Sequence, residues 1–319
     1  MTAQPQVSVL MAVYNAGQYL NYALQSLLNQ TLMDLEVLAV DDASTDGSLA
    51  ILERTAQADP RLRVFRQSEN QGQAVARNVA LRHARGEFVC MVDADDWLSP
   101  DALERGVEVF RRYPLTDSVV FRLMEYWQDT GAERPYPTPQ FTSLTGEEAF
   151  RLSLDWTLHG LYLIRREIHL RYPYDDSYRL YSDDNTTRLH YLHSREVRPC
   201  AGIYYYRKHA ESTTMAVSPL RFLYMWANLS MRRTLEQEHV APAVMALYDR
   251  HRWHNYLSQL WLFWDNCTHF SAAERTRLRQ DFRKVYATFC RPWPYLFFLA
   301  SQRLRWRLRR TLQRLHLSA

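Results

Sequence analysis

The chain has 319 residues, of which 47% are hydrophobic and only nine are glycine. This length supports one large domain or two modest ones, each with a sizeable core. No two glycines lie closer than 14 positions. The sequence therefore contains no G-x-G-x-x-G, no Walker A loop and no Gly-rich kinase loop, and it excludes the phosphate-binding proteins that use them.

The formal net charge of +4 conceals a division along the chain. Residues 1–218 carry 22 basic and 29 acidic side chains, a net charge of −7, whereas residues 219–319 carry 17 and 6, a net charge of +11. Such an asymmetry predicts an anionic partner for the C-terminal part, and nucleic acid and an anionic membrane surface are the two usual candidates.

Cysteine usage and hydropathy predict a cytoplasmic protein. The four cysteines contain no C-x-x-C pair and indicate neither a disulfide framework nor a zinc site. The first residues lack a basic segment followed by an apolar run, so no signal peptide is expected. No apolar stretch reaches about 18–20 residues, so no spanning helix is expected either.

The first 125 residues alternate short apolar runs, typical of strands buried on both faces, with amphipathic stretches typical of helices. The predicted strands are Val7–Val13, Leu35–Val40, Leu62–Phe65, Phe88–Val92 and Ser118–Leu123. The predicted helices cover about 17–30, 47–58, 71–85 and 100–112, the last with Ser99 as N-cap and Pro100 in its first turn. This alternation predicts a mainly parallel α/β sheet with right-handed crossovers.

The later chain is predicted to be less regular. Three prolines and two glycines between about 127 and 146 indicate a loop or linker. Residues 147–215 mix helical and strand patterns, and the chain from 219 onwards is helical and rich in aromatic residues. We therefore expect one domain over 1–218, with halves of about 1–125 and 126–218, and a basic helical region over 219–319.

An acidic cluster follows the fourth predicted strand, where ligands bind in parallel α/β sheets. Asp93, Asp95 and Asp96 lie within four residues and repel one another. A divalent cation such as Mg²⁺ or Mn²⁺ would relieve that repulsion and could hold a substrate diphosphate without a glycine cradle. The alternative is an acidic helix N-terminus that only complements the helix dipole.

Polar residues near the same edge are candidates for binding a nucleotide. Asp42 follows the second strand and could accept hydrogen bonds from a base or ribose, although this segment could also form only a turn and cap. Tyr14 follows the first strand and could stack on a base. Arg77, on the third helix, is a candidate for a phosphate contact or for a simple ion pair.

Four blocks, in order, resemble the family 2 inverting glycosyltransferases with the GT-A fold. They are Val7–Asn15, Val40–Ser48, Ala76–Asn78 and Gly86–Asp96, with Ala12 where the family commonly has proline and Ala43 where it commonly has glycine. The resemblance implies a GT-A, Rossmann-like mixed, mainly parallel sheet with flanking helices. It also implies a nucleotide-sugar donor, most commonly a UDP-sugar, and a D-x-D element that binds the metal-bound diphosphate.

The resemblance also assigns residues to roles. The metal ligands it implies are Asp95 and Asp96. The donor-binding residues it implies are Ala12, Tyr14, Asn15, Asp42, Arg77, Asp93, Ala94 and Asp95. The family's general base commonly lies in a Glu-Asp pair that opens a helix, and here Asp183-Asp184 matches that pair. Asp184 is then the base and Asp183 its neighbour, with the one-residue register left open; an N-cap pair is the alternative.

The last predicted helix is arginine-rich, with leucines at helical spacing, which is typical of an amphipathic helix lying on an anionic membrane. The alternative is a terminal helix docked on the protein through its leucines. We therefore expect a peripheral membrane glycosyltransferase that acts on a glycan or lipid-linked acceptor in bacterial surface polysaccharide synthesis. A nucleic-acid-binding protein and an inactive nucleotide-sugar-binding module are the alternatives; the acidic sheet edge argues against nucleic acid.

Overall fold

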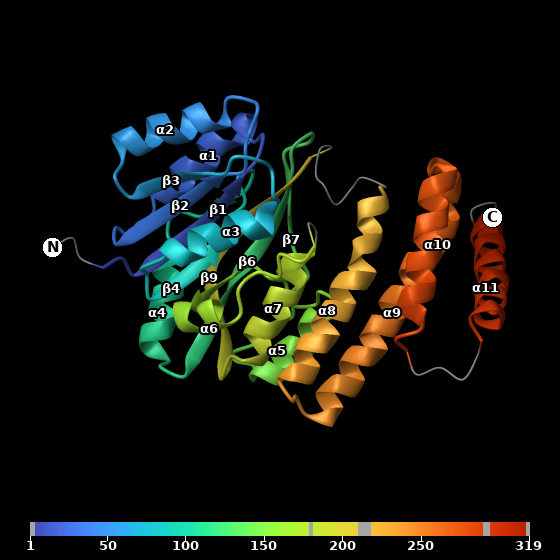
Figure 1. The fold of residues 1–319 in the computed structure, drawn as a ribbon. Helices are drawn as coiled ribbons and strands as arrows, with labels where there is room; N and C mark the ends of the chain where they lie inside the picture. The colour runs from blue at the N-terminus through green and yellow to red at the C-terminus, as the bar shows by residue number, and fades with distance from the viewer. Residues whose placement is uncertain (1–3, 179–180, 210–217, 290–293, 317–319) are drawn as a thin grey trace. The chain divides into compact units, whose positions relative to one another are not determined.

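The computed structural model describes residues 4–178, 181–209, 218–289 and 294–316. They fall into two compact units, Met1–Ala216 and Val217–Ala319 (Figure 1). The first unit contains the sheet, and the regular elements among the described residues of the second are all helices.

The sheet of the first unit is mixed, and its first four strands are parallel. They are β1 (Val7–Val13), β2 (Leu35–Asp41), β3 (Leu62–Arg66) and β4 (Phe88–Met91), in the order β3-β2-β1-β4. The sheet continues from β4 with β8 (Tyr162–Arg165), β6 (Thr116–Trp127), β9 (Glu196–Lys208) and β5 (Trp97–Leu98), and β7 (Ala132–Pro135) pairs with β6. Strand β8 is antiparallel to β4 and β6, whereas β9 is parallel to β6.

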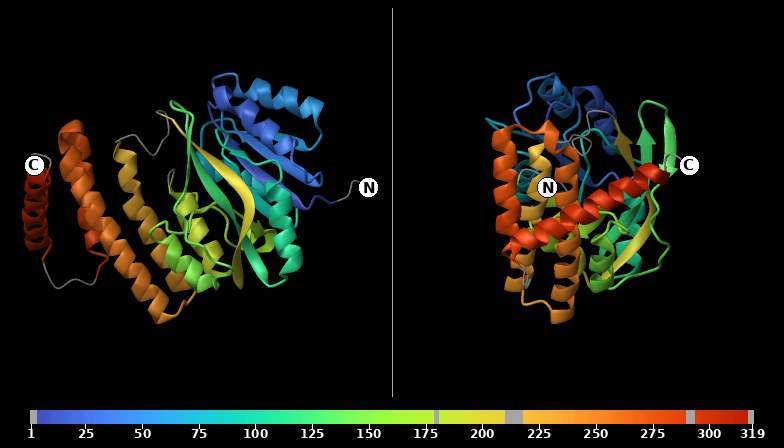
Figure 2. Two further views of the ribbon diagram at one scale, coloured as in Figure 1. Left: turned by 180° about the vertical axis from the view of Figure 1, so that it is seen from behind. Right: turned by 90° about the vertical axis from the view of Figure 1, so that its right-hand side faces the viewer.

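Helices cover both faces of the parallel strands because alternate side chains point to opposite faces. Val9 and Met11 of β1 join a core with helices α1 (Gly17–Leu28), α2 (Ser48–Ala58) and α4 (Ala102–Arg112). Leu10 joins a second core with α3 (Gln73–His83), the helix that lies in front of the sheet in Figure 1; Figure 2 shows the sheet from behind. The remaining helices of this unit are α5 (Gly146–Ser153), α6 (Arg166–Arg171) and α7 (Ser182–Leu192).

The predicted α/β architecture, its first strands and its helices are confirmed, with two local corrections. The segment predicted as a linker contains β7, which forms a ladder with the end of β6. Helix α4 begins at Ala102 rather than at Pro100, and Ser99 does not cap it: the Ser99 hydroxyl donates to Asp101 Oδ1 at 3.1 Å. In the first case the chain turns back between Trp127 and Ala132, so that β7 forms a hairpin with β6; in the second, local hydrogen bonding moves the start of the helix.

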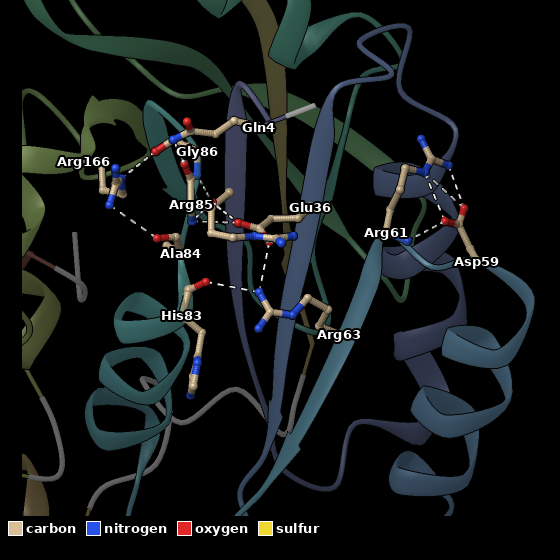
Figure 3. A network of polar contacts seen from close by, with 11 residues as sticks. Gln4, Glu36, Asp59, Arg61, Arg63, His83, Ala84, Arg85, Gly86 and Arg166 are labelled. Carbon is tan, nitrogen blue, oxygen red and sulfur yellow. Dashed lines mark hydrogen bonds and ion pairs between the residues drawn. The ribbon is translucent and has the colours of Figure 1, made fainter. Parts of the chain in front are cut away.

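A buried carboxylate ties the strands together at the edge opposite the acidic cluster. Glu36, at the start of β2 and 2% exposed, accepts hydrogen bonds from the Ser8 hydroxyl at 2.8 Å and the Arg85 backbone at 2.7 Å. Arg63 and Arg85 also place their guanidinium groups on it (Figure 3). Burial alone would raise the pKa of Glu36, but the bonds from Ser8 and Arg85 hold it below its ordinary value. This network joins β1, β2, β3 and the turn before β4.

The second unit is a helical assembly around an aromatic core. Its helices are α8 (Tyr224–Gln237), α9 (Pro242–Asn266), α10 (Ala272–Tyr286) and α11 (Tyr295–His316), with short 3₁₀ turns at Pro219–Leu223 and Cys267–His269. Tyr256, Phe263, Phe282 and Tyr286 are among the rings buried at its centre. Among the described helices, none is both long enough and apolar enough to cross a membrane.

Candidate active site

Parallel strands bring the candidate residues to one edge of the sheet. Strands β1, β2 and β4 are parallel, so the segments that follow their carboxyl ends meet there. The end of β9 joins them through hydrogen bonds to residues 93–96, and the start of α7 joins them through the electrostatic interaction of Asp183 with Arg77. We call this edge the candidate active site.

The segment after β1 is fixed to the segment after β2. Asn15, with φ of 49°, receives a hydrogen bond at its Oδ1 from the Thr45 backbone at 2.8 Å, and its own N–H donates to Ser44 Oγ at 3.1 Å. Tyr14 is 51% exposed beside it. Ala12 packs its methyl group against the core under α3. Asn15 therefore holds the loops in register, and Tyr14 is the side chain free to meet a planar ligand.

The two aspartates at the end of β2 have opposite surroundings. Asp42 is 2% exposed and accepts from the Gln71 and Gly72 backbones at 2.8 Å each and from the Gln67 side chain. Both of its oxygens thus serve the fold. Asp41 is fully buried, and within the described part of the chain its Oδ1 has no hydrogen-bond partner. A buried acceptor without a partner is costly, so the two neighbouring aspartates differ: the fold satisfies both oxygens of Asp42 and leaves one oxygen of Asp41 unsatisfied.

Arg77 links α3 to the acidic loop. Its side chain is 1% exposed, its Nη2 contacts Asp93 Oδ1 at 2.5 Å, and its guanidinium lies 5.4 Å from the centre of the Tyr174 ring. Burial alone would lower the pKa of Arg77, but the negative charges of Asp93 and Asp183 raise it above its ordinary value. Nη1 has no partner among the described residues. Arg77 therefore stays charged and retains a donor for an anionic ligand.

The end of β9 holds the acidic loop from behind. Asp96 is 1% exposed and accepts from the Tyr204 hydroxyl at 2.8 Å and from the Arg207 backbone at 2.7 Å. Arg207 also donates through Nε to the carbonyl of Asp95 at 2.7 Å. His209 Nε2 lies 2.9 Å from Asp95 Oδ2. Asp96 thus anchors the loop, and the side chains of Asp93 and Asp95, each 32% exposed, remain at the surface of the site.

The electrostatics of this loop suit a cation. Burial and the charge of Asp93 raise the pKa of Asp95, and burial with the charges of Asp93 and Asp95 raises that of Asp96 well above its ordinary value. A bound cation would remove this penalty, and carboxylate oxygens suit Mn²⁺ or Mg²⁺. Within the described ranges, no three such side chains gather closely enough to hold a metal by themselves. The donor set therefore fits a cation shared with oxygens of a ligand.

The acidic pair of α7 opens that helix, as predicted, after Tyr181 in a left-handed conformation. Asp183 lines a small cavity with Cys90, His169 and Thr187. Asp184 is 8% exposed, and its Oδ2 lies 3.7 Å from Nη2 of the fully buried Arg188. Asp183 therefore lies toward β4 and Arg77, and Asp184 toward the body of α7.

Sequence reasoning did not assign Asp41, Tyr204, Arg207 and His209 to the site. Asp41 and Asp42 are adjacent in the sequence, and no local sequence signal shows which of them the fold satisfies with hydrogen bonds. The β9 residues lie more than a hundred positions from the loop that they hold. Residues 147–215 showed only a mixture of helical and strand patterns, and tertiary pairing alone shows what Arg207 contacts.

The family assignment rests on a match to the family model described as Glycosyl transferase family 2, over residues 8–172. The putative glycosyltransferase EpsH of Bacillus subtilis is 41% identical over 127 residues, which make up 40% of this chain and 36% of that protein. Chondroitin synthase of Escherichia coli is 42% identical over 108 residues, 34% of this chain and 16% of the synthase. These alignments thus take in a minority of each relative's length.

Solved structures share the fold at lower identity. The chain resembles TarS 1–349 of S. aureus, solved in complex with UDP-GlcNAc, with a TM-score of 0.66 and 22% identity over 88% of this chain and 81% of that one. It also resembles the mannosyltransferase PcManGT of Pyrobaculum calidifontis, solved with GDP-Man and Mn²⁺, with a TM-score of 0.55 and 20% identity over 94% and 85%. The fold is thus GT-A-like, and because the family model covers more than half of its residues, the chain belongs to glycosyl transferase family 2.

Proposed function

We propose that this chain is an inverting glycosyltransferase that moves a sugar from a nucleoside-diphosphate sugar to a hydroxyl group. The observation that carries the proposal is the meeting of Arg77, Asp93 and Asp95 at the carboxyl ends of the parallel strands of a family 2 chain. The UDP-GlcNAc complex of TarS favours a UDP-sugar as donor, and the GDP-Man complex of PcManGT makes a GDP-sugar the alternative.

The donor's nucleoside would lie over the segments that follow β1 and β2. Tyr14 is exposed enough to pack on a base. Asn15 and Asp42 would position these segments through their bonds within the protein. Arg77 would donate its remaining N–H groups to a phosphate or ribose oxygen.

Asp95 is the proposed metal ligand, with Asp93 and His209 beside it and with Asp96 fixing the loop. Ala94 between them is buried and offers a cation no side-chain donor. When bound, Mn²⁺ or Mg²⁺ would offset the charge that develops on the departing nucleoside diphosphate. The same neutralisation would keep Asp95 ionised despite its burial.

The base belongs to the acidic pair of α7, with Asp184 as the proposed base and Asp183 as its neighbour. Asp184 would take the proton of the acceptor hydroxyl while that oxygen forms a bond to the anomeric carbon. The bond from the anomeric carbon to the diphosphate breaks in the same step, so the sugar is transferred with inversion. The nearby Arg188 guanidinium favours the ionised carboxylate that a base needs.

The acceptor is proposed to be a glycan or a lipid-linked glycan at the cytoplasmic face of a membrane. Relatives named as chondroitin synthase and as a putative teichuronic acid biosynthesis glycosyltransferase support polysaccharide synthesis. The basic charge of residues 219–319 supports an anionic membrane surface as partner.

Ligand-dependent stabilisation tests the proposal. UDP-sugars and GDP-mannose, each with and without MnCl₂, are screened for a rise in melting temperature of the full chain. A ligand at a hundred times its Kd adds about 2.7 kcal/mol to the free energy of unfolding. We expect one nucleotide class to stabilise the protein, and to do so only with metal.

The variant D95N should lose the metal-dependent part of this stabilisation. The matched control is E53Q, which removes a carboxylate charge from an exposed position on α2 and should respond like the wild type. The proposal is wrong if no nucleotide sugar stabilises the protein with metal, or if D95N keeps the full metal-dependent rise.

A further inference from the structure

Helix α11 packs through one side against the other helices of the second unit. Phe298 is 5% exposed and stacks on Tyr286 with ring centroids 4.6 Å apart. Gln302 is 6% exposed, and Trp306 donates through its indole N–H to Asp265 at 3.0 Å. Positions 298, 302 and 306 are four residues apart and therefore share one side of the helix. This side is the docked face of α11.

The docked face does not include Leu304, the first leucine of the stripe through which the helix would dock in the alternative. Leu304 is 61% exposed. The side chains of the other three leucines in the predicted stripe, Leu308, Leu312 and Leu315, lie outside the described residues. The alternative, in which this helix docks through its leucines, therefore does not hold for Leu304.

A second apolar surface remains on the other side of α11. Leu296 is 77% exposed, Phe297 is 68% exposed, and Leu304 lies seven residues, about two turns, after Phe297. We call these three residues the outer strip. They are three of the nine large hydrophobic residues that stand exposed in the described chain, gathered on one helix. Grouped exposed apolar side chains mark an interaction surface more often than single ones do.

Charge decides what fits the outer strip. Arg303 and Arg305 flank Leu304 and are both exposed. The helix sequence from 295 to 316 contains no acidic residue. A second copy of the chain would bring arginines against arginines, which is unfavourable. An anionic lipid surface instead offers phosphates to the arginines and an apolar layer to the strip.

We propose that the outer strip of α11 enters the headgroup layer of an anionic membrane while the docked face keeps the helix on its unit. The inference rests on the proposed function for its purpose, because a lipid-linked acceptor lies at that surface. It names the inserting residues and separates them from the docked ones.

Vesicle sedimentation tests the apolar half of the inference. Full-length protein is mixed with vesicles of phosphatidylglycerol and phosphatidylcholine, or of phosphatidylcholine alone. We expect L296S/F297S to lower partitioning onto the anionic vesicles about tenfold, from lost apolar burial. The matched control is M33S/L115S, which replaces residues 67% and 64% exposed on the first unit and should bind like the wild type.

A second pair of variants tests the charged half. R303Q/R305Q should lower anionic partitioning about thirtyfold, since each arginine near such a surface adds about 1 kcal/mol. The control R277Q/R279Q removes the same charge from exposed positions on α10 and should cost clearly less. Equal losses in the two pairs would mean non-specific attraction and would overturn the inference.

Two further outcomes would also overturn it. One is wild-type binding by L296S/F297S. The other is a wild-type dimer in analytical ultracentrifugation that this variant abolishes, because a second copy would then cover the outer strip. Metal-dependent hydrolysis of the donor, measured without vesicles, should be the same in all variants. Its absence from the wild type would contradict the proposed function and leave the vesicle result standing.

Discussion

The two carboxylates at the start of α7 are neighbours in sequence but have different surroundings. Asp183 lines a cavity beside β4, and its charge contributes to the raised pKa of Arg77. Asp184 is nearly buried and lies near Arg188. A carboxylate close to the donor site and another held by an arginine are suited to separate tasks, and amide substitutions can separate them.

We expect D184N to lower sugar transfer by about 10²- to 10⁴-fold, because an amide cannot accept the acceptor's proton. Donor binding should persist, since Asp184 lies beside Arg188 of its own helix and is not one of the residues proposed to bind the donor. D183N should instead weaken donor binding, through the altered charge around Arg77. Transfer rates and the donor Kd, measured for both variants, provide the check.

The control for this pair is D176N, which neutralises an exposed carboxylate in the loop before α7. It should leave both quantities unchanged. If D183N abolishes transfer and D184N does not, the base is Asp183 and the register of the pair is shifted by one residue.

At the scale of elements, strand β9 supports the candidate active site by holding the acidic loop, residues 93–96. Tyr204 and Arg207 bond the acidic loop from behind. The Arg207 guanidinium also lies within 6 Å of the ring centres of Tyr19, Trp97 and Tyr126, and donates to the Gln128 side chain. A guanidinium held by rings and hydrogen bonds fixes the carbonyl of Asp95 in place, and with it the carboxylate proposed to bind metal.

The substitution R207K should raise the Mn²⁺ concentration needed for half-maximal activity about tenfold. Lysine keeps the charge but loses the planar fork that bonds Asp95 and Gln128 together. The maximal rate at saturating metal should fall much less, which distinguishes a misplaced loop from a damaged fold. Metal titrations of donor turnover provide this measurement.

R198K is the matched control, because it makes the same exchange on the same strand, where the arginine pairs with Glu196 and packs on Tyr113. Its metal requirement should equal that of the wild type. An equal shift in both variants would mean that β9 affects metal binding only through stability.

At the scale of the whole molecule, three buried histidines make the first unit sensitive to acid. Burial lowers the pKa of His159 and of His190 to about 4 and that of His169 well below its ordinary value of 6.5. The unfolded chain binds these protons at higher pH than the folded chain does. The free energy of unfolding that the histidines contribute is therefore complete above pH 6.5 and is lost as the pH falls toward 4.

We expect H159Q to flatten the pH dependence of unfolding between pH 6.5 and 4. His159 alone accounts for roughly 2–3 kcal/mol over this window. The raised pKa of Asp96 acts in the opposite direction, so the comparison of variants isolates the histidine. Urea unfolding at several pH values provides the measurement.

H254Q is the control, since His254 is exposed on α9. Its pH profile should follow the wild type. A slope in H159Q as steep as in the wild type would contradict the assignment.

The division of charge at about residue 218 falls close to the boundary between the two compact units. The acidic part contains the sheet and the proposed metal site, and the basic part contains the helical unit with the outer strip. We propose that the two parts are separate domains, with the boundary near 218, one for the donor and one for the membrane.

The sequence by itself determined the parallel strands, their helices and the edge of the sheet that carries chemistry. Apolar runs, amphipathic periods and strand-end aspartates are local signals, so β1 to β4 could be located from the order of residues alone. The tertiary structure decided what each polar residue does. Asp41 and Asp42 are equivalent in sequence, and only packing leaves one of them with an unpartnered oxygen. Strands β5 and β8 and the contacts of β9 with the acidic loop escaped prediction because hydrogen bonds to segments distant in sequence, rather than local propensity, form them. Strand β7 escaped because its polar sequence shows no strand pattern, although it pairs with the neighbouring β6.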